Sequence, residues 1–360
     1  MVYKSIRNSN IELLRLICMF IIILHHAVFY GGGIGTGLPF NSFLSACFYI
    51  GGKFGANCFM AISAYYLIGS SFKIQRIVSV WKTTFFYGIL FFILNFAFHF
   101  KTLQIIDVLE TALPITYKSY WYITAFVGIL FLSPFLNMTI EKLTKNTYGM
   151  LVIILFFMVA VPITIFPKAM PFADESHLLL FVFIYLLIGY YKKGYIIDVH
   201  KMVKLLMVLG LAWMILSALI VIVLSCLMSK TSIASYSTFW MKGESIPMIM
   251  ASIGLTLYVF EKEPNEIRII NSISKGSLDI YLIHMNHFVY LWLWKQIIPV
   301  SSLVNDYAYS IIILAVAFVI FTITLTIGNI RALLFSCIFK RFKIPRVEGI
   351  YMKINKIMNF

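Results

Sequence analysis

The sequence predicts an all-helical integral membrane protein, a bundle of about ten transmembrane helices with both termini in the cytoplasm. Hydrophobic residues make up 61% of the 360 residues, charged residues make up only 12%, and the mean hydropathy is +0.93. A typical soluble domain is about 45–50% apolar and about 25% charged. Apolar windows of about 20 residues, the length of helix that crosses a bilayer, cover most of the chain.

These windows define the predicted spans and the domain boundaries. The spans lie near residues 11–30, 41–69, 77–100, 120–137, 148–167, 177–191, 203–228, 239–260, 277–298 and 308–335. We therefore expect one multi-span domain over residues 1–338 and a short basic cytoplasmic tail at 339–360. No small-residue cleavage site follows the first apolar run, which predicts an uncleaved first span.

The net charge of +15 fits this topology. With the N-terminus inside, the predicted cytoplasmic segments hold 20 Lys and Arg residues and the outer segments hold 6. This bias is the positive-inside rule, so the basic surplus indicates membrane orientation and not a nucleic-acid-binding surface. The five cysteines are scattered without CxxC spacing, so we expect neither a disulfide nor a zinc site from them.

The first predicted span carries ionisable residues on one face. Arg15 and His26 are eleven residues apart in RLICMFIIILHH, which is three helical turns plus about 20° and about 16 Å along the axis. His25 lies about 100° away, and Glu12 lies one turn before Arg15, where the two side chains can pair. Arg15 alone is also explained by snorkelling to the inner headgroups. Together these residues predict a polar channel, because ionisable groups in hydrocarbon usually mark a site.

Five segments in order along the chain resemble the membrane acyltransferase 3 family. The first, IELLRLICMFIIILHHA (11–27), is similar to the family's opening Arg and His signature. The others are GANCFMAISAYYL (55–67), KIQR (73–76), YWYITAF (120–126) and GSLDIYLIH (276–284). Met60 and Ala64 differ from the usual Phe and Gly of the second segment. The resemblance covers about residues 8–335 and implies a multi-span bacterial enzyme that O-acetylates surface glycans, with a cytoplasmic donor and an outer acceptor.

Acyl transfer from a thioester to a sugar hydroxyl sets the roles that we expect. The reaction needs a base for the hydroxyl proton, a group that stabilises the oxyanion, and cations for the phosphates of coenzyme A. Histidine titrates near neutrality, so His26 is the expected base, and a transiently acylated His26 stays an open alternative. Arg15 is the second expected catalytic residue. Lys73 and Arg76, at the inner mouth, are expected to bind donor phosphates.

Later segments add further candidates. Trp121 and Tyr122 are either interfacial belt aromatics or a stacking surface for sugar, and Ser63 is either a packing residue or a hydrogen-bond donor. His284 is expected to orient substrate, with Tyr281 on the same helix. The predicted substrate-binding set is Glu12, Ser63, Lys73, Arg76, Trp121, Tyr122, Tyr281 and His284.

Two histidines late in the chain are candidate metal ligands. His284 and His287 lie one turn apart, a spacing compatible with a metal ion, but the sequence fixes no third ligand. We therefore expect no metal and interpret His287 as a packing residue.

The predicted function is transfer of an acyl group, most simply acetyl, from cytoplasmic acyl-CoA to a hydroxyl of a cell-surface or exported polysaccharide at the bacterial plasma membrane. Acetyl-CoA is the expected cosubstrate. The expected partners are a glycan acceptor, membrane lipid and a separate extracytoplasmic transferase, but no nucleic acid. A flippase or transporter of lipid-linked sugars would favour repeated halves, and a polymerase would favour a large outer loop. Both stay alternatives, and the acceptor, the acyl group and the oligomeric state stay open.

Overall fold

The computed structural model describes residues 7–117, 119–166, 177–196, 198–339 and 345–359. Every regular element in those ranges is a helix, which confirms the predicted all-helical class. Residues 340–344 of the predicted tail lie outside the described residues, as do Lys118 and Lys168, which entered the charge count as outer residues.

Among the described residues, six helices or helix pairs are long and apolar enough to cross a membrane. They are α1 (Ser9–Tyr30), α3 (Ile74–Phe98), α5 (Trp121–Lys142), α6 (Lys145–Val159) with α7 (Val161–Ile165), α9 (Val199–Leu227) and α15 (Tyr309–Phe339). A seventh span is possible if α10 (Thr231–Ala234) and η1 (Ser235–Met241) are joined with α11 (Ile246–Phe260), across a 45° bend. These elements define a multi-pass membrane protein.

The remaining three predicted spans correspond to elements that do not meet this criterion. The span expected at 41–69 is α2 (Pro39–Leu67), a continuous helix of 29 residues, and the span expected at 177–191 is α8 (Leu178–Lys192), only 15 residues long. The single continuous helix expected at 277–298 is not present. The chain there forms α13 (Ser277–His284), a turn, and the π-helix η3 (Trp292–Ile297).

The chain divides into two compact units. Unit 1 contains Met1–Phe59, Asp198–Tyr281 and Leu293–Asn329, and unit 2 contains Met60–Ile197, Leu282–Trp292 and Ile330–Phe360. The short elements not yet given are α4 (Ile105–Ala112) and α16 (Pro345–Met358) in unit 2, and α12 (Arg268–Ile273), η2 (Ser274–Gly276) and α14 (Val300–Leu303) in unit 1.

Glycines on α2 bring α1 and α2 of unit 1 close together. A Cβ atom on Gly51 would strike the Ile21 backbone, and one on Gly52 would strike the His25 ring. Small residues allow two helix backbones to approach in this way. The close contact sets the rotation of α1 about its own axis, and so determines which of its side chains face α2.

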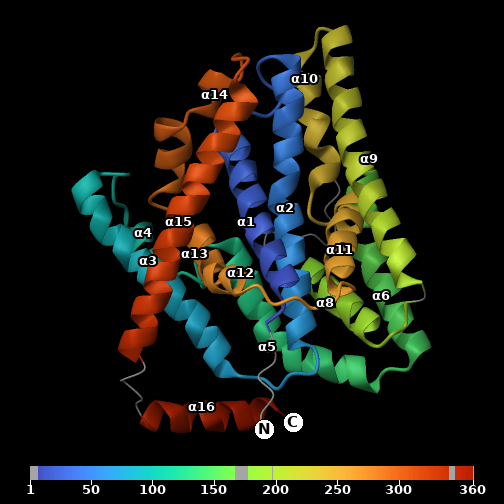
Figure 1. Ribbon diagram of the computed structural model, residues 1–360, viewed down its shortest axis with the longest axis vertical. Coiled ribbons are helices and arrows are strands. Elements are labelled where there is room, and N and C mark those ends of the chain that lie inside the picture. The colour runs from blue at the N-terminus through green and yellow to red at the C-terminus, as the bar shows by residue number, and fades with distance from the viewer. Residues whose placement is uncertain (1–6, 118, 167–176, 197, 340–344, 360) are drawn as a thin grey trace. The chain divides into compact units, whose positions relative to one another are not determined.

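Unit 1 is completed by α9 and α11, which run side by side in Figure 1. Their contact also depends on a glycine, because a Cβ on Gly254 would lie 2.8 Å from the Met207 nitrogen. Two residues of α2 bind this part of the unit: the Asn57 amide donates to the Gly243 carbonyl at 2.9 Å, and the Cys58 thiol donates to the Ser252 carbonyl at 3.4 Å. α2 is thereby packed between α1 and the α9–α11 pair.

Unit 2 is held together by buried polar contacts between its helices. The Tyr185 hydroxyl of α8 donates to the Asn137 side chain of α5 at 2.8 Å, and the Asn137 amide donates to the Leu67 carbonyl at the end of α2. Asn355 of α16 accepts a hydrogen bond from the Ile74 nitrogen at the start of α3, and Asn359, just after α16, accepts one from the Phe72 nitrogen. Figure 1 shows α16 lying crosswise to the end of α15.

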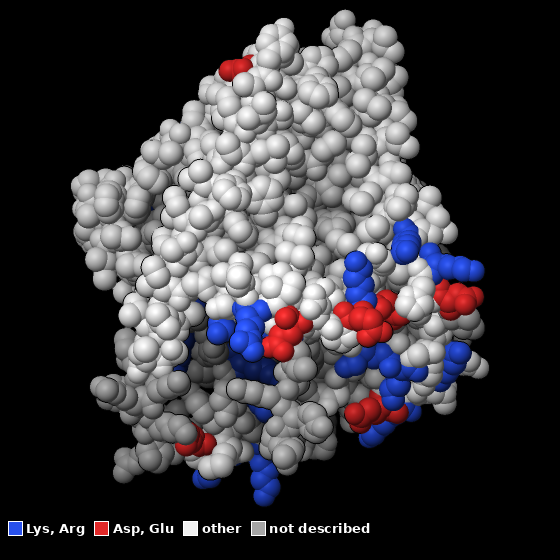
Figure 2. All heavy atoms as spheres, viewed as in Figure 1, with Lys and Arg blue, Asp and Glu red and all other residues white. Residues whose placement is uncertain are grey.

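On the face seen in Figure 2, most of the visible charged side chains lie in the lower part of the view. In unit 1, one group of charged residues lies at the start of α9 and between the end of α11 and the start of α12: Lys201, Lys204, Glu261, Lys262, Glu263, Glu266 and Arg268. An apolar surface bounded by such charges is typical of helices that lie in lipid.

Candidate functional site

The α1 charge cluster comprises Arg7, Glu12 and Arg15. Glu12 is buried, and its two carboxylate oxygens accept separately from Arg7 Nη2 at 2.7 Å and from Arg15 Nη1 at 3.1 Å. The predicted Glu12–Arg15 pair is therefore present. Arg7 was missed as a site residue, since the sequence explained it as a topology charge. Two guanidinium groups facing one carboxylate leave the cluster with a surplus of positive charge.

Local contacts hold Arg7 in this cluster. Its second terminal nitrogen, Nη1, donates to the Asn271 carbonyl at 3.2 Å, and the Asn271 amide donates back to the Arg7 carbonyl at 2.9 Å. Ser9, at the start of α1, also bonds Asn271 and the backbone of Ile267. The first turn of α1 is thus fixed to α12, which orients Glu12 and Arg15 on the helix.

His25 has a packing role. Its Nδ1 atom donates to the Tyr49 carbonyl of α2 at 2.6 Å, and its ring stacks on Phe29 and lies in the space left by Gly52. Because a carbonyl can only accept, this contact fixes the proton of a neutral ring on Nδ1. His25 is therefore engaged in holding α1 against α2.

His26 is also buried, but its neighbours differ. Its ring lies between Tyr30, one turn further along α1, and Tyr281 of α13, with ring centroids 5.7 Å and 6.5 Å away. The predicted separation of His25 and His26 onto different faces is present. In unit 1 the structure thus places His26 beside Tyr281, and Glu12 and Arg15 together three turns earlier on α1.

Three candidates of unit 2 lie near the loop between α2 and α3. Ser63 is half-buried on α2, and Lys73 is exposed at the N-cap of α3. The Arg76 guanidinium donates to the Ser70 hydroxyl at 3.2 Å and to the Ser71 carbonyl at 3.3 Å. Arg76 therefore makes hydrogen bonds within its own loop, and fewer of its N–H groups can donate to a phosphate.

Trp121 and Tyr122 start α5 and form an aromatic cluster with the beginning of α8. The Trp121 ring lies 4.9 Å from the His177 ring, and the Tyr122 ring lies 5.5 Å from the Phe181 ring, as measured between centroids. Both side chains are half-buried, so part of each ring remains open to a ligand. Trp121 and Tyr122 are consecutive in the sequence, and their ring centroids lie 5.9 Å apart.

His284 is fully buried at the end of α13 in unit 2, and its segment is held by a residue that the sequence analysis missed. The buried Tyr120 hydroxyl donates to the Leu282 carbonyl at 2.8 Å and accepts from the Asn286 amide at 2.8 Å. Tyr120 lies within the quoted YWYITAF segment, so its place in a matched motif was the available signal. It fixes the backbone on both sides of His284.

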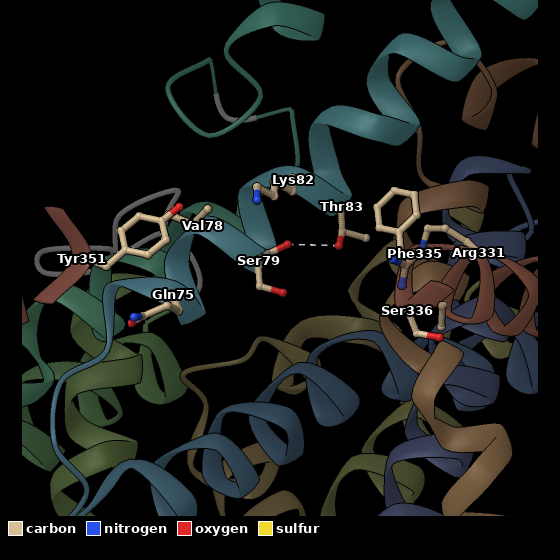
Figure 3. Close-up of a pocket in the computed structure, with 10 residues that line it drawn as sticks. Gln75, Val78, Ser79, Lys82, Thr83, Arg331, Phe335, Ser336 and Tyr351 are labelled. Carbon is tan, nitrogen blue, oxygen red and sulfur yellow. Dashed lines mark hydrogen bonds between the residues drawn. The ribbon is translucent and has the colours of Figure 1, made fainter. Parts of the chain in front are cut away.

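A cationic pocket of about 450 Å³ lies in unit 2 between α3, α15 and α16. Figure 3 shows Lys82 and Arg331 among its lining residues, with the hydroxyl groups of Ser79, Thr83 and Ser336. The Arg331 guanidinium stacks over the Phe335 ring, 5.0 Å from its centroid, which orients it. This pocket could not be predicted from the sequence, because Lys82 and Arg331 lie far apart in the chain.

Long apolar helices with buried ionisable side chains define a multi-pass membrane protein with a candidate site inside its spans. The chain belongs to the acyltransferase 3 family, whose acyltransferase domain matches residues 8–328. The protein is therefore an acyltransferase of the membrane, and the resemblance predicted from the motifs is confirmed. No curated protein and no solved structure matches the chain.

Proposed function

We propose that this acyltransferase moves an acetyl group from cytoplasmic acetyl-CoA to a hydroxyl of a cell-surface or exported polysaccharide at a bacterial plasma membrane. The observation that carries the proposal is the family match over residues 8–328, which includes both Arg15 and His26. The donor, the acceptor and the direction of transfer rest on the family resemblance and on the distribution of charges. The proposed topology keeps ten membrane segments with both termini inside.

His26 is the proposed base. An acceptor hydroxyl gives its proton to the imidazole as its oxygen attacks the thioester carbon, and collapse of the tetrahedral intermediate expels the coenzyme A thiolate, which takes up a proton. The route through an acylated His26 remains an alternative with the same overall balance. The burial of His26 beside Tyr281 supports this role, because a base shielded from bulk water acts on a bound hydroxyl instead of on solvent.

The α1 charge cluster supports a role for Arg15 with the donor. Two guanidinium groups, those of Arg7 and Arg15, share the single carboxylate of Glu12, so the three side chains together carry a net positive charge that attracts an anionic donor. A guanidinium can hold an oxyanion or phosphate oxygen through two parallel hydrogen bonds. We therefore assign Arg15 to the acyl donor.

The cationic pocket of unit 2 is the proposed seat for phosphates of the donor, together with Lys73 and Arg76. Its volume of about 450 Å³ is in the usual range for small-molecule sites. Lys82 and Arg331 supply two cations, while the hydroxyl groups of Thr83 and Ser336 already donate to the backbone carbonyls of Ser79 and Leu333. A basic amphipathic helix such as α16 beside the pocket is suited to lie at the inner membrane surface, where acyl-CoA arrives.

The direct test compares surface-glycan O-acetylation in cells that lack the protein, cells that express it, and cells that express His26→Ala at the same membrane level. The proposal expects ester-linked acetate only with the unmodified protein. A flippase or polymerase would change the amount or length of surface glycan and leave its acetate content per sugar unchanged, and that result would overturn the proposal.

Cysteine labelling tests the topology. The buried Gly33 is a poor site for a label, because a Cβ there would lie 2.7 Å from the Tyr309 hydroxyl, whereas Thr36 in the same loop is exposed. In a variant whose exposed Cys226 and Cys337 are replaced, Thr36→Cys and Ser232→Cys should react with an impermeant reagent from outside, and Asn146→Cys should not. The reverse pattern would contradict the proposed orientation.

A further inference from the structure

Three ionisable side chains of unit 2, named here the α4 cluster, converge outside the candidate site. Asp107 and Glu110 lie one turn apart on α4, and His287 lies in the turn that follows α13. Each residue offers one ligand atom within 4.8 Å of the other two, the one such group of His, Cys, Asp and Glu in the described ranges. The sequence hid the group because α4 and His287 lie far apart in the chain.

His287 is the informative member of the cluster. Its side chain is only 9% exposed, and neither ring nitrogen has a hydrogen-bond partner among the described residues. Its Nδ1 atom faces Glu110 Oε2 at 3.9 Å, which is too long for a hydrogen bond. Buried polar atoms are nearly always paired, so an unpaired imidazole aimed at a carboxylate indicates a missing ligand.

The α4 cluster already contains one cation, Lys101, which pairs with only one of its two carboxylates. The Lys101 ammonium donates to Asp107 Oδ1 at 2.6 Å, and the Gln104 backbone nitrogen donates to Asp107 Oδ2 at 2.8 Å. Two carboxylates therefore face one ammonium, and the charge balance favours an added cation.

We propose that His287, Asp107 and Glu110 bind a first-row divalent metal ion of the Zn²⁺ type, with water completing its coordination. One imidazole nitrogen and two carboxylate oxygens suit such an ion. A neutral imidazole nitrogen offers a lone pair to a metal ion. Small side-chain rotations would have to bring the ligand atoms to about 3 Å from one another, the separation set by metal bonds of about 2.0–2.2 Å.

The consequence of metal binding lies in the segment that carries His287. This segment also contains His284, three residues earlier, and Asn286, which bonds Tyr120. A metal ion held jointly by α4 and His287 would tie this turn to α4 and order the backbone after His284. The inference replaces the earlier expectation that His287 only packs and that no metal binds, and it does not depend on the proposed function.

The test uses purified full-length protein without a polyhistidine tag, stripped with a chelator and then titrated with ZnCl₂ by calorimetry. The expected result is one Zn²⁺ per chain and a rise in the unfolding temperature on binding. His287→Gln and Glu110→Gln should each weaken binding by roughly tenfold or more. Glu110 is partly exposed, so its variant serves as the second probe if His287→Gln does not fold.

A matched control is the surface pair His200 and Glu261, whose Nε2 and Oε2 atoms lie 3.1 Å apart. His200→Gln should bind zinc as the unmodified protein does, and Lys101→Met should bind it more tightly because the competing ammonium is gone. The proposal is overturned if the unmodified protein binds no zinc, or if His200→Gln removes the binding and His287→Gln and Glu110→Gln do not. Unchanged affinity in Lys101→Met also contradicts it, because the α4 cluster would then not be where zinc binds.

Discussion

The α1 charge cluster and the α4 cluster have opposite ratios of cations to carboxylates. Glu12 is shared by two guanidinium groups, whereas Asp107 and Glu110 share one ammonium. The first cluster therefore contains two cations and one carboxylate, and the second contains two carboxylates and one ammonium, so the first attracts an anion and the second a cation. The comparison teaches that the count of partners around a buried charge predicts the sign of the ligand it can accept.

The largest expected effect concerns the face of α1. His26→Ala should lower the rate of acyl transfer by roughly 10²–10⁴ fold, the usual loss for a positioned base. His25→Ala should reduce the rate far less, because His25 is engaged with the Tyr49 carbonyl, and its loss should appear instead as about 1 kcal/mol of stability. Transfer rates and thermal unfolding are compared at matched membrane expression. An inactive His25→Ala beside an active His26→Ala would show that the roles are reversed.

Removing one cation from each cluster tests the comparison itself. Arg7→Met leaves Glu12 paired with Arg15, so it should cost about 1 kcal/mol or less. Lys101→Met leaves the buried Asp107 without its ammonium, so it should cost about 2–3 kcal/mol. Unfolding is measured with a chelator present, so that no metal ion replaces the lost charge. Equal losses would mean that the partner count does not decide the stability of these clusters.

The parts that the sequence could predict are those that depend on local pattern. The face shared by Glu12, Arg15 and His26 follows from helical spacing within one apolar run, and the structure has the expected pair. Apolarity does not reveal the turn that interrupts the helix expected at 277–298. There the Asn286 side chain accepts from the Phe288 nitrogen and donates to Tyr120, and these contacts end the helix.

The parts that the sequence could not predict depend on contacts between distant segments. Asp107 and Glu110 look like ordinary charges of a short outer connection, and His287 looks like packing in an apolar stretch. Only the fold places them together. The same holds for Lys82 and Arg331, which share a pocket although one lies on α3 and the other on α15.

Arg15→Lys sharpens the assignment of the α1 charge cluster to an anionic ligand. Lysine keeps the charge and can still pair with Glu12, but a single ammonium cannot also present a planar pair of donors to the acyl donor. We expect a loss of activity of about 10–100 fold with nearly unchanged stability. Full activity in this variant would mean that charge alone is needed, and the argument from guanidinium geometry would fail.

The smallest expected effect distinguishes two groups of cations in unit 2. Lys82→Gln and Arg331→Gln should each raise the apparent KM for acetyl-CoA by about tenfold, equivalent to about 1.4 kcal/mol of lost phosphate contact. Lys73→Gln and Arg76→Gln should raise it less, because Lys73 is exposed and Arg76 donates to Ser70 and Ser71 of its own loop. Initial rates are measured over a range of acetyl-CoA at saturating acceptor, so that a change in donor binding is separated from a change in kcat. If Lys73→Gln and Arg76→Gln have the larger effect, the donor phosphates bind at the α2–α3 loop, and the pocket of Figure 3 has another ligand.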